Sequence, residues 1–176
     1  FDQTSFSKFL IHGKDALSLL NYLCVSEMDV PIGKIVYTQM LNSESGTESD
    51  LTITRLGEEE FMAITSPTSH NKDFYWIKNN STEYADLQID DVTEKFGCLS
   101  IMGPKSRNLL QRITNEDVSN NTFPFGHSIK ANILNAECQI NRITYVGELG
   151  YEIYIPIGDM QEVFDLIYCE GKKYNL

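Results

Sequence analysis

Basic residues are scarce in this 176-residue sequence, which has 14 Lys and Arg against 25 Asp and Glu and a net charge of −11. A surface of this sign repels the phosphates of nucleic acids and of anionic lipids, so we predict neither nucleic acid nor a membrane as a partner. No apolar stretch approaches the ~20 residues that cross a bilayer. No charged segment followed by an apolar run opens the chain, so no signal peptide is indicated.

Cysteine motifs are also missing. The four cysteines, Cys24, Cys98, Cys138 and Cys169, lie far apart in the sequence, without a C-x-x-C pair or a Cys/His cluster. This argues against zinc, and we predict no metal site. Cys24 and Cys98 have apolar neighbours and are expected to be buried thiols. A reducing compartment fits best, either the cytoplasm or, in a eukaryote, the mitochondrial matrix, with an undetected disulfide as the alternative.

Two further signals are weak or absent. The G-x-G-x-x-G fingerprint of dinucleotide-binding domains does not occur. The three histidines, His12, His70 and His127, are isolated from one another, and we interpret them as surface or satisfied core residues rather than ligands.

The stretch from Val36 to Ile53 predicts a β-hairpin. Residues 36–42 and 47–53 are rich in strand formers, and the polar link 43–46 is rich in turn formers. Apolar side chains would line one face and polar side chains the other. Asp50 stands just before an apolar alternation. Its carboxylate could belong to a partly desolvated binding site, but the pattern alone favours a solvated residue near a turn.

The first half of the chain predicts an antiparallel sheet with two helices. The helices are a segment capped by Asp15 and a segment that starts at Ser66-Pro67-Thr68 and ends near residues 79–81. The other expected strands are residues 5–12, 61–64 and 85–90. We assign residues 7–92 to a ferredoxin-like antiparallel α+β subdomain.

A second antiparallel α+β unit is expected from about Thr93, comprising residues 93–176 with 1–6. Gly103-Pro104 marks a turn from strand into helix, which is either a plain helix start or an anion site. Residues 115–125 are expected to be a loop. The expected strands are residues 98–102, 128–134, 138–146 and 151–156, and the last helix spans 159–169. The overall fold class is therefore α+β, with two antiparallel-sheet layers and packed helices.

The segment from Arg142 to Glu152 carries a second polar signal. It predicts two strands around a glycine-bounded turn. In the second strand, Glu152 and Tyr154 should point away from the core that Tyr151, Ile153 and Ile155 face. If nothing covers this face, Glu152 is simply solvated.

Two motifs, VYTQMLNSESGTESDLTITRL and R-I-T-Y-V-G-E-L-G-Y-E, resemble the tetrahydrofolate-binding module of the glycine-cleavage T-protein (aminomethyltransferase) family. Within that family the chain is most similar to the C-terminal part of sarcosine and dimethylglycine dehydrogenases. The resemblance covers essentially the whole chain. It implies a T-protein-like fold that is truncated, with the family's N-terminal segment, later arginine-bearing helix and C-terminal barrel outside this chain. Since the chain opens at Phe1 without Met, we expect it to be a fragment.

The resemblance also implies roles for five residues. Asp50 corresponds to the family's aspartate beside the reactive folate nitrogen and is the expected catalytic group. Glu152 corresponds to the glutamate that holds the pterin ring, where a carboxylate can accept two adjacent N–H donors. The other expected folate-binding residues are Tyr37, Tyr145 and Phe6, of which Phe6 stands where many members have Met.

The activity implied by the resemblance is one-carbon transfer to tetrahydrofolate within a larger enzyme. An FAD-binding half of the parent chain would oxidise a methylated glycine, and this module would capture the one-carbon unit. The fragment alone is expected to be inactive. The alternatives are the glycine cleavage T-protein itself and a non-catalytic relative of the regulatory subunit of pyruvate dehydrogenase phosphatase, which shares a VYTQML-like run.

Overall fold

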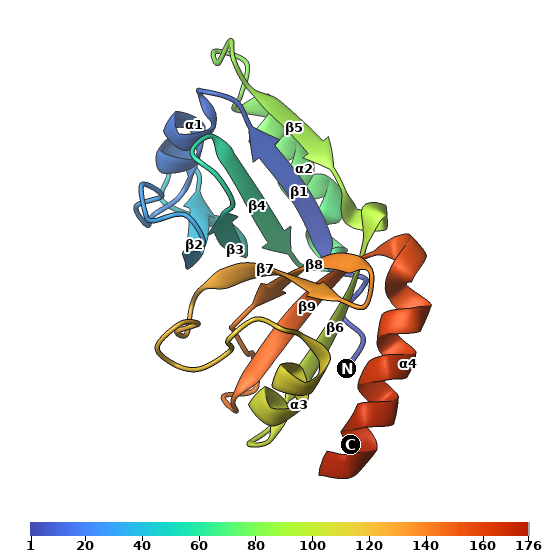
Figure 1. Cartoon of the computed structure of the whole chain (residues 1–176). Helices are drawn as coiled ribbons and strands as arrows, with labels where there is room; N and C mark the ends of the chain where they lie inside the picture. Colours follow the sequence, from blue (N-terminus) through green and yellow to red (C-terminus); the bar gives the residue numbers. More distant parts are fainter. Residues whose placement is uncertain (176) are drawn as a thin grey trace. The chain divides into compact units, whose positions relative to one another are not determined.

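The computed structural model describes residues 1–175 and contains two antiparallel sheets with packed helices, which confirms the predicted fold class (Figure 1). The chain divides into two compact units. The first, called here the N-terminal unit, comprises residues 5–93. The second, the C-terminal unit, comprises residues 1–4 together with residues 94–176.

The N-terminal unit is built on a five-stranded sheet in the order β2-β3-β4-β1-β5, with every neighbouring pair antiparallel. Two helices connect its strands, one after β1 and one after β4 (Figure 1). Without β2 the chain follows a β-α-β-β-α-β pattern. The elements are β1 (Ser7–His12), α1 (Ala16–Leu23), β2 (Ile35–Leu41), β3 (Thr47–Arg55), β4 (Glu60–Thr65), α2 (His70–Asn79) and β5 (Gln88–Asp91).

One face of this sheet packs against both helices. Leu19 and Leu20 of α1 and Ile77 of α2 belong to the same buried cluster as Met40 and Ile53 on the hairpin. Strand alternation then places the side chains of odd-numbered β2 residues and even-numbered β3 residues on the opposite face, which carries no helix of this unit. The expected two-faced hairpin over β2 and β3 is confirmed.

Asp15 stands at the N-cap position directly before α1, as expected, but the expected side-chain cap and the expected start of β5 were wrong. Asp15 does not cap α1 with its side chain. Instead its carboxylate accepts a 2.9 Å hydrogen bond from the Asp86 N–H, and its own N–H donates to the Asp86 carbonyl. The chain is therefore held in a bend at Asp86, and the strand expected over residues 85–90 begins only at Gln88.

Gly13 makes this bend possible. Its φ is +118°, and a Cβ atom at this position would lie 2.3 Å from the Asp86 carbonyl oxygen. Only glycine meets both requirements.

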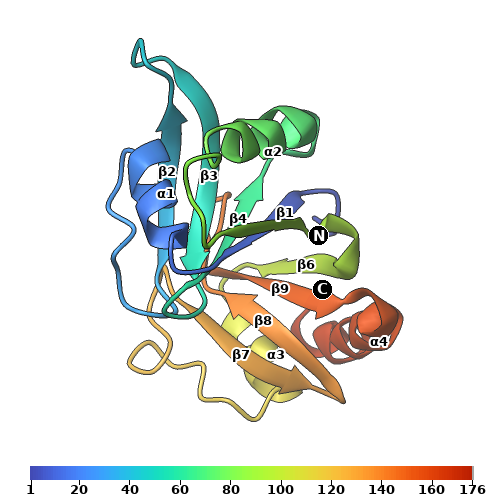
Figure 2. The ribbon, with the colours of Figure 1, turned by 90° about the horizontal axis from the view of Figure 1, so that it is seen from above.

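The C-terminal unit is a four-stranded antiparallel sheet in the order β6-β9-β8-β7, with two helices (Figure 2). Residues 1–3 extend its edge, since Asp2 bridges to Leu99 and the Gln3 N–H donates to the Cys98 carbonyl. The elements are β6 (Phe96–Met102), α3 (Ser106–Ile113), β7 (Ser128–Ile133), β8 (Ala136–Asn141), β9 (Gly150–Pro156) and α4 (Met160–Gly171).

The core of this unit lies between the sheet and both helices. Tyr151, Ile153 and Ile155 of β9 pack there with residues of α3 and α4, as the alternation predicted. Glu152 and Tyr154 consequently lie on the face of the sheet away from these helices.

The strand expected over residues 138–146 was wrong at both ends, because β8 starts at Ala136 and stops at Asn141. The ladder between β7 and β8 ends at the pair Ser128–Asn141, and beyond it, within the described residues, only Arg142 exchanges backbone hydrogen bonds, with Gly126 and His127. The Thr144 hydroxyl then accepts a 3.3 Å hydrogen bond from the Val146 N–H, which turns the chain away from the extended conformation.

Candidate functional site

Asp50 is exposed on the helix-free face of the N-terminal unit. It stands directly opposite Gln39 in the β2–β3 ladder. The Tyr37 hydroxyl donates a 2.8 Å hydrogen bond to Asp50 Oδ2, and the Gln39 amide donates a 3.3 Å bond to Oδ1. Two neighbouring side chains of β2 therefore fix the carboxylate while leaving it open to solvent.

The structure thus brings together two of the residues predicted for the site, Tyr37 and Asp50. Gln39 was missed by sequence reasoning. The sequence did place Gln39 on the same strand face as Tyr37, because the two residues are two positions apart. The pairing of Gln39 with Asp50, however, depends on the register between β2 and β3, which the sequence does not specify.

Phe6 lies just before β1 in the same unit, and 38% of its surface is exposed. Its carbonyl accepts a 2.8 Å hydrogen bond from the ammonium group of Lys8, whose side chain is fully buried. The backbone of Phe6 is therefore held in place while its ring stays accessible.

Glu152 is half-buried on the helix-free face of the C-terminal unit. The Tyr154 hydroxyl, two residues along the same strand face, donates a 2.7 Å hydrogen bond to Glu152 Oε2. Burial raises the pKa of the Glu152 carboxyl, and the bond from Tyr154 opposes part of that rise. Within residues 1–175 no hydrogen bond to the other oxygen, Oε1, is found, so this oxygen can accept from a ligand.

Tyr154 is suited to orienting this carboxylate. Burial, followed by the neighbouring Cys98 and Glu152, raises the pKa of the Tyr154 hydroxyl well above its ordinary value. The hydroxyl therefore stays protonated and acts as a donor at neutral pH.

Two amide side chains continue the polar face around Glu152. Asn141 stands directly opposite Glu152 in the β8–β9 ladder, and Gln139 stands opposite Tyr154. The Gln139 amide donates a 3.2 Å hydrogen bond to Asn141 Oδ1. Sequence reasoning missed both residues, because only the pairing of the strands shows that they share a face with Glu152.

Tyr145 lies in the exposed segment between β8 and β9, with 94% of its surface accessible. It is not on a strand, and with this exposure its ring packs against little of the described protein. Asp50 and Glu152 belong to different units, so whether Asp50, Tyr37, Phe6, Tyr145 and Glu152 meet at one site stays a prediction.

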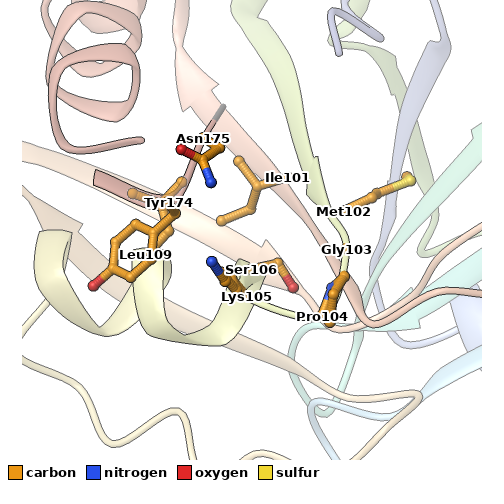
Figure 3. A pocket seen from close by; sticks show the side chains of 9 residues that line it. All are labelled: Ile101, Met102, Gly103, Pro104, Lys105, Ser106, Leu109, Tyr174 and Asn175. Atoms are coloured by element: carbon orange, nitrogen blue, oxygen red, sulfur yellow. The ribbon is translucent and has the colours of Figure 1, made fainter. Parts of the chain in front are cut away.

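A pocket of about 280 Å³ lies elsewhere in the C-terminal unit, where β6 turns into α3 (Figure 3). Gly103, Pro104 and Lys105 form one wall, and Tyr174 and Asn175 approach from the turn after α4. The hydroxyl of Ser106 already donates a 3.0 Å hydrogen bond to the Leu149 carbonyl. None of the predicted site residues lines this pocket.

Ser7, His70 and Asp91 form a hydrogen-bonded line that superficially suggests a hydrolase triad. His70 Nδ1 lies 2.9 Å from Ser7 Oγ, and His70 Nε2 lies 3.0 Å from Asp91 Oδ2. Ser7 is fully buried, so no substrate can reach its hydroxyl. The line instead joins β1, α2 and β5, and His70 is a satisfied structural residue as predicted.

Among the described residues, no group of three or more His, Cys, Asp or Glu side chains could hold a metal ion. No helix in residues 1–175 is long and apolar enough to cross a membrane. Cys24 and Cys98 are buried thiols, as expected, and burial raises the pKa of Cys24 to about 12.

Comparison with known families gives one match along the whole chain. The model described as the GCVT N-terminal domain matches residues 1–176.

Three relatives illustrate the range of similar proteins. The chain is 36% identical to 4-methylaminobutanoate oxidase (formaldehyde-forming) of Paenarthrobacter nicotinovorans, over 100% of this chain and 21% of the relative. It is 32% identical to an aminomethyltransferase of Listeria monocytogenes, over 97% of this chain and 47% of the relative. It is 31% identical to human mitochondrial sarcosine dehydrogenase, over 100% of this chain and 21% of the relative. The chain thus spans between a fifth and a half of the length of these relatives.

A solved structure shares the fold. The glycine cleavage system aminomethyltransferase T of Bartonella henselae superposes with a TM-score of 0.81 at 24% sequence identity, over 95% of this chain and 44% of that chain.

Proposed function

The chain belongs to the GCVT N-terminal domain family, and on that basis we propose that it is the tetrahydrofolate-binding, one-carbon transfer module of a sarcosine or dimethylglycine dehydrogenase-like enzyme. The similarity to human sarcosine dehydrogenase supports this choice. In such an enzyme the FAD that oxidises the amine would be bound by another part of the protein.

The observation that carries the proposal is the 2.8 Å hydrogen bond from Tyr37 to Asp50. The family resemblance implies a folate contact for both residues, which come from different strands. This bond and the second hydrogen bond, from the Gln39 amide, orient the exposed carboxylate of Asp50 without enclosing it. Such a carboxylate can stabilise positive charge on a nearby nitrogen and accept a proton from it.

The surroundings of Glu152 fit the pterin ring. A pterin presents its 2-amino group and ring N3–H side by side, and a carboxylate can accept from both donors. Tyr154 holds one oxygen of Glu152, and the second oxygen has no hydrogen bond from the described residues. Half-burial of the carboxylate strengthens these charge-assisted bonds.

Tetrahydrofolate would supply the two nitrogen atoms that take up the one-carbon unit. The unit would arrive as the CH₂ of an iminium ion formed by amine oxidation. The carbon would form bonds to both folate nitrogens and lose its bond to the glycine nitrogen. The two N–H protons displaced from folate would leave with the amine as its ammonium form, so charge balances. Asp50 would accept and pass on the first of these protons.

The close alternative is the glycine cleavage aminomethyltransferase, which receives its aminomethyl group from a lipoyl carrier. The match to the Listeria aminomethyltransferase over 97% of this chain supports it. Both functions use the same folate site and differ in the donor of the one-carbon unit. A non-catalytic regulatory module would require neither Asp50 nor Glu152.

The test is folate binding and product formation by the full-length protein that contains this chain. Equilibrium titration with tetrahydrofolate should give saturable binding. Oxidation of sarcosine or dimethylglycine should then yield methylene-tetrahydrofolate, whereas product from an aminomethyl-lipoyl carrier alone would favour the aminomethyltransferase. Absence of folate binding would overturn the proposal and favour the regulatory role.

A further inference from the structure

Gln39 presents an unused hydrogen-bond acceptor beside Asp50. Its amide nitrogen Nε2 donates to Asp50 Oδ1, and since an ionised carboxylate only accepts, the nitrogen is the atom that faces Asp50. The amide oxygen Oε1 is therefore turned away from the carboxylate. It makes no hydrogen bond within residues 1–175 and is not buried, so a ligand can reach it.

We infer that Gln39 Oε1 and Asp50 accept the two reacting N–H groups of tetrahydrofolate, one each. This inference rests on the proposed function, in which Asp50 stands beside one of the folate nitrogens. It adds a residue that holds the second nitrogen, so that the side chains of one β-hairpin orient both reacting atoms.

The backbone of Gln39 is held on both sides of β2. On one side, Gln39 is the direct partner of Asp50 in the β2–β3 ladder. On the other side, the Val25 N–H donates a 3.0 Å hydrogen bond to the Gln39 carbonyl, and Cys24 bridges to Met40. The side chain thus projects from a backbone with little freedom to move, which lowers the entropic cost of presenting Oε1 to a ligand.

The positions of the two acceptors suit the ligand. Gln39 and Asp50 lie on the same face of the sheet, and directly opposite residues of an antiparallel ladder have Cβ atoms about 4.5–5.5 Å apart. The folate nitrogens N5 and N10 are attached to neighbouring carbons, and each carries one N–H before reaction. Two adjacent donors therefore meet two adjacent acceptors, whereas Asp50 alone would leave the second N–H to solvent.

The two acceptors differ in what they can do. A carboxylate is basic enough to take a proton, whereas a neutral amide oxygen is not. Asp50 takes the proton of the nitrogen that attacks the iminium carbon first. Gln39 only orients the second nitrogen, which then bonds to the same carbon as the bond to the glycine nitrogen breaks. The proton of this second nitrogen leaves with the amine, so Gln39 is a positioning residue.

The experiment measures equilibrium binding of three ligands to the full-length protein, namely tetrahydrofolate, 5-deaza-tetrahydrofolate and 10-deaza-tetrahydrofolate. Each deaza analogue replaces one reacting N–H by CH₂ at nearly the same volume. Wild type is compared with Gln39→Met, which removes the acceptor and keeps the length of the side chain. Tyr37→Phe removes a donor to Asp50 and leaves Oε1 in place, so it measures the loss that a less firmly held carboxylate causes.

Gln161→Met is the matched control. The Gln161 amide also donates to an exposed aspartate, through a 3.0 Å hydrogen bond to Asp165 on α4, outside the candidate site. Melting temperatures establish that each variant is folded.

We expect Gln39→Met to weaken binding of tetrahydrofolate and of one analogue by about two- to tenfold, the usual effect of one neutral hydrogen bond. The other analogue, which lacks the N–H that Gln39 accepts, should lose distinctly less affinity. Tyr37→Phe should not spare that same analogue, because its effect passes through Asp50. Gln161→Met should change none of the three dissociation constants.

The possible failures are distinguishable. If Gln39→Met weakens all three ligands equally, or none of them, Gln39 accepts no N–H and this inference is wrong, but the proposed function stands. If wild type binds no tetrahydrofolate, the proposed function fails, and the inference fails with it. Wild type decides the question even if Gln39→Met does not fold, because both analogues should bind more weakly than tetrahydrofolate. Either analogue binding as tightly as tetrahydrofolate would overturn the inference.

Discussion

The Tyr154 hydroxyl donates a 2.7 Å hydrogen bond to Oε2 of Glu152, two residues away on the same face of β9. The bond fixes the rotation of the carboxylate and uses only one of its oxygens. In our account this is how the C-terminal unit keeps a half-buried carboxylate ready for the two donors of a pterin edge.

Replacing Glu152 should mainly affect folate affinity. Hydrogen bonds to a charged group contribute about 1.5–3 kcal/mol each, so Glu152→Gln should weaken tetrahydrofolate binding by about 10- to 150-fold. Isothermal titration with the full-length protein measures this. Glu137→Gln is the matched control, since Glu137 is an exposed carboxylate on β8, on the same face of the sheet as Glu152. An unchanged dissociation constant in Glu152→Gln would contradict the assignment.

Folate affinity should depend on pH through Glu152. Only the ionised carboxylate accepts both pterin donors, so binding is lost as the pH falls through the Glu152 pKa. Because burial raises that pKa, the loss should occur at higher pH than for an ordinary glutamate. Tyr154→Phe removes the bond that opposes the rise and should move the loss to still higher pH. The measurement is folate affinity as a function of pH for wild type and for Tyr154→Phe. A midpoint of the loss that is lower in Tyr154→Phe than in wild type, or equal to it, would contradict this prediction.

Gly13 should be essential to the N-terminal unit. Gly13→Ala forces a side chain into the left-handed region and against the Asp86 carbonyl. Residues in such conformations cost about 1–3 kcal/mol, and the clash adds to this. Chemical denaturation should show a loss in the free energy of unfolding of at least this size. Gly158→Ala, where an added Cβ meets nothing within 4 Å, should have little effect. Equal stability of the two variants would refute the explanation.

The features that the sequence predicted correctly are those that depend on local pattern. The faces of the β2–β3 hairpin and of β9 follow from alternation, which a single strand specifies by itself. Alternation alone therefore places Tyr154 on the same face as Glu152.

The features that were missed depend on contacts distant in sequence. The start of β5 is set by hydrogen bonds between Asp15 and Asp86, 71 residues apart. β8 ends at Asn141, where its pairing with both β7 and β9 ends. Gln39 and Asn141 belong to the candidate sites through strand register, which a two-residue pattern leaves undefined.

The two candidate sites should converge on one ligand. We expect Asp50, Tyr37, Phe6, Tyr145 and Glu152 to contact a single folate molecule in a structure of the full-length protein with bound tetrahydrofolate. The expectation rests on the family resemblance, which assigns all five to the same cofactor. A bound folate that touches Glu152 and leaves Asp50 remote from its reactive nitrogen would reject the catalytic role of Asp50.

Asp50 should act mainly on the transfer step. Removing a positioned acid–base group typically lowers a rate by about 10²–10⁴-fold, whereas an interaction made chiefly in the transition state contributes little to ground-state affinity. Asp50→Asn should therefore slow one-carbon transfer far more than it weakens folate binding. Asp165→Asn is the control, because Asp165 is an exposed carboxylate on α4.

The most direct measurement is a single turnover of the full-length protein with methyl-¹³C-sarcosine and tetrahydrofolate, in which the label is followed into its products. In wild type and Asp165→Asn we predict that the label appears as methylene-tetrahydrofolate. In Asp50→Asn we predict that it is released as free formaldehyde while folate remains bound. Label that appears as free formaldehyde in wild type, in the presence of saturating tetrahydrofolate, would contradict the central claim.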